Sequence, residues 1–297
     1  MTIMKKVGLF AAKCWIGLMS ITPYWLVYLK SDLLYLVIYH VFRYRRKVVR
    51  QNLLRSFPEK EIKEIKAIER HFYQNLCDQI EESPKMLRMG PKGYKNRVVI
   101  SNPEVIPALF EKEKSVFYAI PHSGNWEWFG KMMPDLSPHN CLAVYKMVKN
   151  PVFEQLMLYM RTKDCNLEMI ESDTAMRRLL QLRNQKCAVL MVADQTPHGL
   201  DSDYWTEFLH QDTCWFTGLE RIAKMLDYAV VFVDMKRVGR GRYEVKLCPI
   251  CDNPKETEKG YIMGQYVREV ERFIQEQPDN WLWSHRRWKH QRNQENK

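Results

Sequence analysis

The 297-residue sequence lacks several patterns that would assign its class at once. Its longest uncharged apolar run, from Cys14 to Leu29, contains Pro23 and is shorter than the ~20 residues that a spanning helix needs. With only 12 Gly and 14 Pro, it is neither collagen-like nor of low complexity. It has no G-x-S-x-G, which excludes the nucleophile elbow of serine hydrolases, and no H-E-x-x-H zinc motif.

Acidic residues are also in deficit. Asp and Glu number 35 against 46 Lys and Arg, a net charge of +11. Such a chain attracts anionic membranes, acidic proteins or nucleic acid. No recognised nucleic-acid-binding motif is present, so we expect no nucleic acid partner. A basic nucleic-acid- or membrane-binding protein without catalysis remains the alternative from another class.

The eight cysteines lie mostly in apolar runs at wide spacing, which is typical of buried free thiols in a reducing compartment. Cys248 and Cys251 form a single C-x-x-C. Without a second pair or a nearby His pair, this motif does not predict a zinc site. We therefore expect neither a metal nor a cofactor.

The N-terminal 42 residues are predicted to associate with a membrane. An apolar stretch from Val7 to Leu29 is interrupted by Lys13, and a second run covers Leu33 to Phe42. The stretch is either one span over 7–29 or, with the second run, two helices lying in the interface with Trp and Tyr anchors. A buried hairpin of a soluble domain is the remaining alternative. Basic residues from Arg43 to Arg50 follow, which places the next domain, 43–297, on the cytoplasmic side of an anionic leaflet.

Residues 43–297 read as one α/β domain. Apolar residues at helical spacing predict a helix over Glu59–Glu82. Short apolar runs then alternate with helical patterns, which indicates a largely parallel sheet flanked by helices. The expected strands are Val116–Ile120, Cys141–Tyr145, Cys187–Ala193, Ala229–Met235 and Tyr243–Leu247. Four later helices are expected. One begins at Asn150-Pro151, and a second, Ala175–Gln185, is capped by Asp173. A Thr217-x-x-Glu220 capping box opens the third, Gly218–Leu226, and the last runs from Tyr261 to Glu276.

Polar side chains follow three of these strands. His122, Lys146 and Asp194 each come just after a strand end. Ligand sites in such sheets lie outside the carboxyl ends of the strands, so we expect these three residues to converge there.

His122 is the candidate general base. With His122 at a strand end and Glu127 in the first turn of the next helix, the two side chains can meet. A carboxylate on one imidazole nitrogen fixes the tautomer and supports the charge when the other nitrogen accepts a proton. The free N–H groups of the helix start could hold an oxyanion. On this expectation, Glu127→Ala costs nearly as much activity as His122→Ala.

A wider set of motifs then carries a resemblance. The sequence is similar to the lipid A biosynthesis acyltransferases over about Leu9 to Lys289, and His122-x4-Glu127 resembles the His-x4-Asp/Glu signature of glycerolipid acyltransferases. The matching motifs occur in order: His-Ser-Gly-Asn-Trp-Glu at 122–127, Tyr145, Asn150-Pro151, Arg161, Ala193-Asp194-Gln195, Phe216-Thr217-Gly218 and the segment from Trp281 to Trp288.

The resemblance implies a glycerolipid-acyltransferase-like fold, with 43–297 as the acyltransferase domain. It implies an enzyme anchored on the cytoplasmic face of the inner membrane. The enzyme would move an acyl chain from acyl-acyl carrier protein to a hydroxyl of a phosphorylated glycolipid, a lipid A precursor. His122 and Glu127 would be catalytic. The expected substrate-binding residues are Asn125, Tyr145, Lys146, Arg161, Asp194 and Gln195.

Alternatives remain within this class. The acceptor could be another lipid hydroxyl, such as that of an amino-acid lipid or a lysophospholipid. Lys146 and the run Thr196-Pro197-His198 depart from the usual family residues. Arg161 either clamps a phosphate or lies on a solvated helix face, and the segment from Trp281 to Lys289 either anchors at the interface or packs its Trp residues in the core.

Overall fold

The N-terminal segment folds as two helices that meet at a sharp bend. In the computed structural model of the protein, which describes residues 3–197, 204–290 and 292, α1 (Ile3–Ile21) ends just before Pro23, and α2 (Tyr24–Tyr35) continues into a π-helical turn, η1 (Leu36–Val41). Together Met4–Ile21 and Tyr24–Val41 have the length and apolarity of a span, but they are bent by 118°. No single helix of the described chain is long and apolar enough to cross a membrane.

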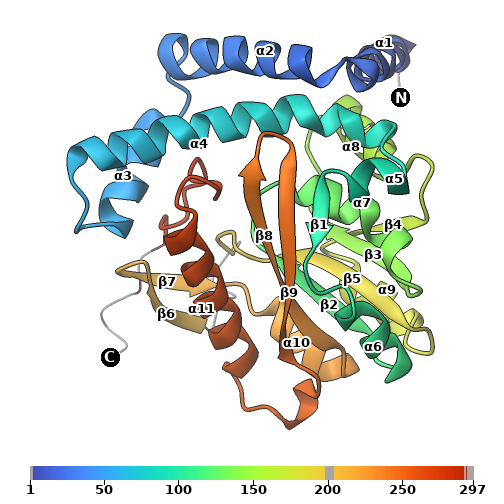
Figure 1. Ribbon diagram of the computed structural model, residues 1–297. Coiled ribbons are helices and arrows are strands. Elements are labelled where there is room, and N and C mark those ends of the chain that lie inside the picture. Colours follow the sequence, from blue (N-terminus) through green and yellow to red (C-terminus); the bar gives the residue numbers. More distant parts are fainter. Residues whose placement is uncertain (1–2, 198–203, 291, 293–297) are drawn as a thin grey trace.

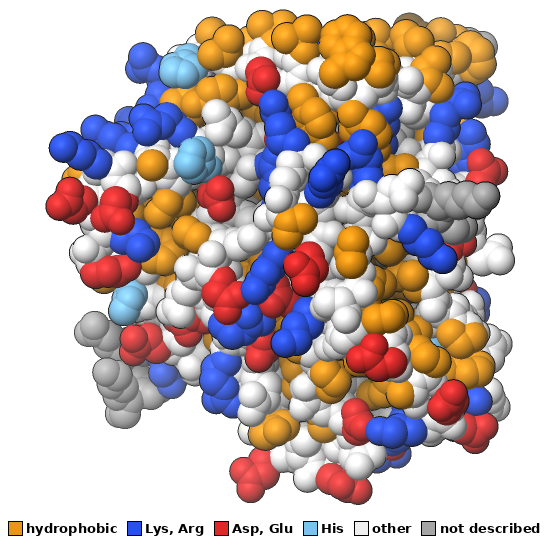
Figure 2. All heavy atoms as spheres, viewed as in Figure 1, with side chains coloured by type: hydrophobic (Ala, Val, Ile, Leu, Met, Phe, Trp, Pro, Cys, Tyr) orange, Lys and Arg blue, Asp and Glu red, His pale blue; other side chains and the backbone are white. Residues whose placement is uncertain are grey.

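These helices lie along one edge of the molecule, where α2 packs beside the long helix α4 (Ile62–Glu82) (Figure 1). Buried polar contacts fix them there. Ser31 Oγ donates to Asp78 Oδ1 over 2.6 Å, and Tyr39 Oη donates to Glu69 Oε1 over 3.1 Å. The opposite faces of α1 and α2 carry exposed apolar side chains, which form a band in Figure 2 with Lys and Arg side chains below it. The helix α3 (Arg46–Ser56) connects this edge to α4.

A seven-stranded sheet forms the centre of the fold, in the order β1-β9-β8-β2-β5-β3-β4. All neighbouring strands are parallel except β8 and β9, which form an antiparallel hairpin. A separate antiparallel hairpin is made by β6 and β7. The strands are β1 (Val98–Ile100), β2 (Val116–Ile120), β3 (Asn140–Tyr145), β4 (Leu167–Glu171), β5 (Cys187–Val192), β6 (Tyr204–Phe208), β7 (Gln211–Trp215), β8 (Ala229–Gly239) and β9 (Arg242–Cys251).

Helices cover both faces of the sheet, so the α/β architecture with a largely parallel sheet is confirmed (Figure 1). Along β2, Phe117 and Ala119 belong to one hydrophobic core, whereas Val116, Tyr118 and Ile120 belong to the other. A strand buried on both faces has no polar alternation, which is why β2 is a continuous apolar run.

The remaining helices are η2 (Ser83–Leu87), α5 (Pro91–Lys95), α6 (Val105–Glu111), α7 (Trp126–Leu136), α8 (Pro151–Thr162), α9 (Ala175–Gln181), α10 (Gly218–Leu226), η3 (Pro254–Glu256) and α11 (Tyr261–Glu276).

Two predicted helix caps are wrong, although the helices exist. Thr217 and Glu220 form no capping box at α10, because the Glu220 carboxylate accepts hydrogen bonds from the N–H groups of Gly260 and Met263 instead. At α9 the N-cap residue is Thr174 rather than Asp173, and the helix ends at Gln181. Asn150 does cap α8, since its Oδ1 accepts from the N–H groups of Val152 and Phe153.

Candidate active site

The carboxyl ends of β2, β5 and β3 lie side by side and place the predicted polar residues at one edge. The register pairs Ile120 with Val192 across β2 and β5, and Val144 with Met191 across β3 and β5. His122 and Asp194 therefore each follow their strand by two residues and meet. Lys146 follows β3 at the same edge.

His122 and Asp194 form a closely coupled pair. The imidazole Nδ1 lies 2.6 Å from Asp194 Oδ1, and the His122 backbone N–H donates to Asp194 Oδ2 over 3.0 Å. The indole Nε1 of Trp281 donates to the same Oδ2 over 2.7 Å. Both carboxylate oxygens are thus satisfied, and the Asp194 side chain is only 2% exposed whereas that of His122 is 18% exposed.

The environment keeps Asp194 ionised. Burial on its own raises the pKa of this carboxyl group, but the neighbouring His122 and the hydrogen bonds from His122 and Trp281 outweigh it and lower the pKa overall. Because an ionised carboxylate only accepts hydrogen bonds, Nδ1 of His122 carries a proton. In the neutral ring Nε2 is therefore the acceptor.

Gln195 caps that acceptor nitrogen. Its Nε2 lies 3.1 Å from His122 Nε2, which suits an amide donor facing a ring acceptor. Trp126 packs edge-on against the ring with centroids 5.0 Å apart. His122 is thus held between two consecutive residues of one loop, Asp194 on Nδ1 and Gln195 on Nε2.

The predicted contact between His122 and Glu127 is absent from the structure. Glu127 instead holds Arg161 of α8 in a bidentate ion pair, with Arg161 Nε and Nη2 at 2.8 and 2.5 Å from its two carboxylate oxygens. The reason is geometric: Asp194 reaches the ring from the end of the neighbouring strand β5, whereas Glu127 lies in the first turn of α7 and faces Arg161 of α8. Arg161 is accordingly not on a solvated helix face.

A cavity of about 560 Å³ opens beside these two pairs. His122, Glu127, Arg161 and Gln195 line its polar part, together with Tyr145 and Lys146. Burial raises the pKa of Tyr145 to about 12, so its phenol stays protonated. The rest of the wall is mainly apolar and comes from α7, β3, β4, β5, α8 and α10, including Gly130, Ala143, Met157, Leu167, Leu190 and Ile222. The volume and lining suit a hydrocarbon chain whose polar end meets His122.

Asn125, which the sequence predicts to bind substrate, does not line this cavity. It is fully buried, its Oδ1 accepts from the Trp128 N–H at the start of α7, and its Nδ2 donates to Glu82 Oε2 over 3.1 Å. Asn125 therefore shapes the helix start rather than lining the cavity. The Gly124 N–H, a candidate oxyanion donor, is already bonded to Asn280 Oδ1 over 3.2 Å.

The C-terminal segment is part of this site, which the sequence prediction missed. Trp281 and Trp283 are buried rather than placed at an interface. The Leu282 N–H donates to the His122 carbonyl, and Ser123 and Trp281 form an antiparallel bridge, so this segment holds the loop that carries His122. The ordered aromatic pattern from Trp281 to Trp288 was the signal for it. His198, one of the predicted departures, lies outside the described residues.

An imidazole–carboxylate pair at the carboxyl edge of a parallel sheet, opening on an apolar cavity, is the arrangement expected of an acid–base enzyme for a substrate with a hydrocarbon chain. The sequence then gives the family. The profile of the bacterial lipid A biosynthesis acyltransferases matches residues 3–290, so the chain belongs to this family and is an acyltransferase. A comparison with curated protein sequences finds no match.

Proposed function

We propose that this protein transfers a fatty acyl chain from acyl-acyl carrier protein to a hydroxyl of a phosphorylated lipid A precursor, with His122 as general base and Asp194 as the carboxylate that orients it. The observation that carries this proposal is the His122–Asp194 pair at the polar end of an apolar cavity. Family membership supports an acyl donor and a lipid acceptor in general.

The proposed reaction is a direct transfer. His122 Nε2 takes the proton of the acceptor hydroxyl while its oxygen attacks the thioester carbonyl carbon, giving a tetrahedral oxyanion. The carbon–sulfur bond then breaks, and the imidazolium returns its proton to the departing thiolate. A positioned base of this kind contributes ~10²–10⁴ in rate. The first turn of α7 lines the cavity through Trp126 and Glu127, and its positive end supports an oxyanion there.

We assign a phosphate of one of the two substrates to Arg161 and Lys146. Glu127 engages Nε and Nη2 of Arg161, and Nη1 forms no hydrogen bond with a residue that the structure describes. Lys146 is exposed at the cavity and forms no ion pair with a described residue. A phosphate of the carrier protein's prosthetic group or of the acceptor fits this pair of cations.

We further propose that residues 1–42 lie on the cytoplasmic face of the inner membrane and that 43–297 form the catalytic domain. The exposed apolar side chains on α1 and α2 support this, because a contiguous apolar band rimmed by basic residues fits an anionic bilayer surface (Figure 2).

The test is mass spectrometry of lipid A and total lipids from cells that lack the gene, rescued with the wild type or His122→Ala. We expect lipid A to lose one acyl chain and only the wild type to restore it. If another lipid loses the chain instead, the acceptor assignment falls and the amino-acid lipid or lysophospholipid alternative gains. If no lipid changes, the proposed reaction is wrong.

A further inference from the structure

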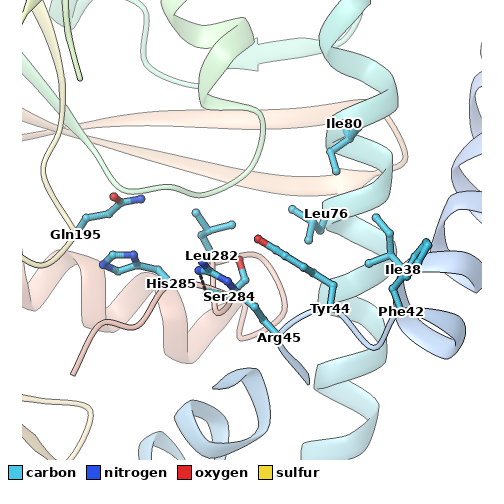
Figure 3. A pocket seen from close by; sticks show the side chains of 10 residues that line it. All are labelled: Ile38, Phe42, Tyr44, Arg45, Leu76, Ile80, Gln195, Leu282, Ser284 and His285. Carbon is cyan, nitrogen blue, oxygen red and sulfur yellow. Dashed lines mark hydrogen bonds between the residues drawn. The ribbon is translucent and has the colours of Figure 1, made fainter. Parts of the chain in front are cut away.

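A second cavity, of about 540 Å³, is also lined by Gln195 (Figure 3). Gln195 and His285 stand at one end of it, and Ile38 and Phe42 of the N-terminal segment stand at the other. We call this cavity the Tyr44 groove. Its walls are formed by η1 and its flanking residues, α4 and the C-terminal segment, and its lining is Ile38, Phe42, Tyr44, Arg45, Leu76, Ile80, Gln195, Leu282, Ser284 and His285.

The outer end of the Tyr44 groove is continuous with the apolar edge of the molecule. Phe42 is 74% exposed and Ile80 is 46% exposed, and the neighbouring Leu36 and Val41 also face outward. A hydrocarbon chain that leaves a bilayer at this edge can therefore enter the groove without crossing water.

The inner end of the groove reaches the proposed base. Gln195 lines both the Tyr44 groove and the cavity beside Glu127, and its amide donates to His122 Nε2. The two cavities thus meet at one side chain, which occupies the position that a substrate hydroxyl must take.

Between the two ends, the chain turns sharply at Tyr44. Arg43 and Arg45 have φ angles of 49° and 51°, which non-glycine residues rarely adopt. The surroundings hold this turn: Tyr73 Oη donates to the Tyr44 carbonyl, and Arg45 Nη1 donates to the Ser284 carbonyl over 3.0 Å. Backbone strain of this kind persists where the structure enforces it, most often at binding sites.

The charges at the turn fit an anionic lipid. Arg43, Arg45 and Lys47 are exposed and form no ion pair with any described residue. Phosphates attached to a lipid entering at Phe42 would lie beside them.

We propose that the Tyr44 groove takes the acceptor: an acyl chain of the phosphorylated lipid lies between η1 and α4, and its hydroxyl displaces the Gln195 amide from His122 Nε2. This assignment rests on the proposed function and leaves the cavity beside Glu127 to the donor chain. The acceptor and donor then occupy two cavities that share Gln195 in their linings, which lets a direct transfer proceed with both substrates bound.

The test is Ile80→Trp in the full-length protein, with Ile62→Trp as the matched control. Both isoleucines lie exposed on α4, 46% and 54% respectively, but only Ile80 lines the groove. The probes are an acyl-acyl carrier protein donor and a phosphorylated diglucosamine lipid acceptor in mixed micelles. Thermal unfolding midpoints of both variants check that folding is unchanged.

We expect Ile80→Trp to raise the KM for the acceptor by about tenfold and to leave the KM for the donor and its acceptor-independent hydrolysis unchanged. Ile62→Trp should match the wild type. An unchanged acceptor KM in Ile80→Trp overturns the groove assignment, and a raised donor KM instead shows that the donor chain occupies it. If the wild type transfers nothing, or His122→Ala transfers as well as the wild type, the proposed function itself fails.

Discussion

His122 and His285 both contact the run Asp194-Gln195-Thr196, but their partners there differ, and so does the ability of each ring to take a proton. Asp194 and Gln195 hold His122 through its two ring nitrogens, whereas Thr196 donates its N–H to His285 Nε2 over 3.2 Å. The His122 ring has an ionised carboxylate on Nδ1. Burial lowers the pKa of His285 to about 4, and neighbouring Arg287 adds to that effect.

The difference teaches that the partner, not the ring, decides what an imidazole can do. A carboxylate on Nδ1 stabilises the positive charge that Nε2 acquires on taking a proton. A backbone N–H directed at Nε2 needs that nitrogen to stay unprotonated. Under the proposed function, we expect proton transfer at His122 and a structural role for His285. Four variants test this contrast.

The largest effect is expected for His122→Ala. Loss of the base should lower the rate of acyl transfer by ~10³–10⁴ with little change in the KM of either substrate. Single-turnover transfer from labelled acyl-acyl carrier protein measures this. An unfolding midpoint like that of the wild type ensures that the loss is chemical, and a rate within tenfold of the wild type would remove His122 from the mechanism.

Asp194→Asn should come next, with a loss of ~10²–10³ in kcat. An asparagine amide facing Nδ1 donates a hydrogen bond, so the ring proton moves to Nε2 and the base nitrogen is blocked. The pH–rate profile distinguishes this from misfolding, because the limb that reports the base should shift while the unfolding midpoint at pH 7 changes little. A variant with the wild-type profile would show that another group orients His122.

Glu127→Gln should have a smaller effect. The substitution removes the charge that fixes Arg161 but leaves His122 and Asp194 in place. We therefore expect the KM of the substrate whose phosphate Arg161 binds to rise about tenfold, and kcat to stay within about threefold of the wild type. Arg161→Lys is the matched variant and should behave alike. A kcat loss as large as that of His122→Ala would instead restore the sequence-based pairing of Glu127 with His122.

The sequence predicted which polar residues lie at the carboxyl edge of the sheet, but not which carboxylate pairs with His122 there. Val116–Ile120 and Tyr261–Glu276 have the predicted bounds, because continuous apolar runs and helical periodicity are local signals. Which carboxylate reaches His122 depends on the register between β2 and β5, a contact between residues 72 positions apart. The strands β1, β4, β6 and β7 were not predicted; β4, for example, reads Leu-Glu-Met-Ile-Glu, which is neither a continuous apolar run nor a strict alternation. No local pattern predicts that Trp281 donates to Asp194.

The smallest effect on activity is expected for His285→Gln, whose amide oxygen can still accept from Thr196. Activity should stay within about threefold of the wild type. The effect should appear instead in how the free energy of unfolding depends on pH. Because the pKa of His285 is about 4 when folded and ~6.5 when unfolded, the unfolded chain binds more protons between these values, so the wild type loses stability as the pH falls from 6.5 towards 4.

At a partly exposed site this contribution is about 1–2 kcal/mol. Urea denaturation at pH 7 and pH 5 measures it: the wild type should lose more free energy of unfolding between these values than His285→Gln. Equal losses would mean that His285 titrates normally, and the contrast with His122 would then lie in the Asp194 carboxylate alone.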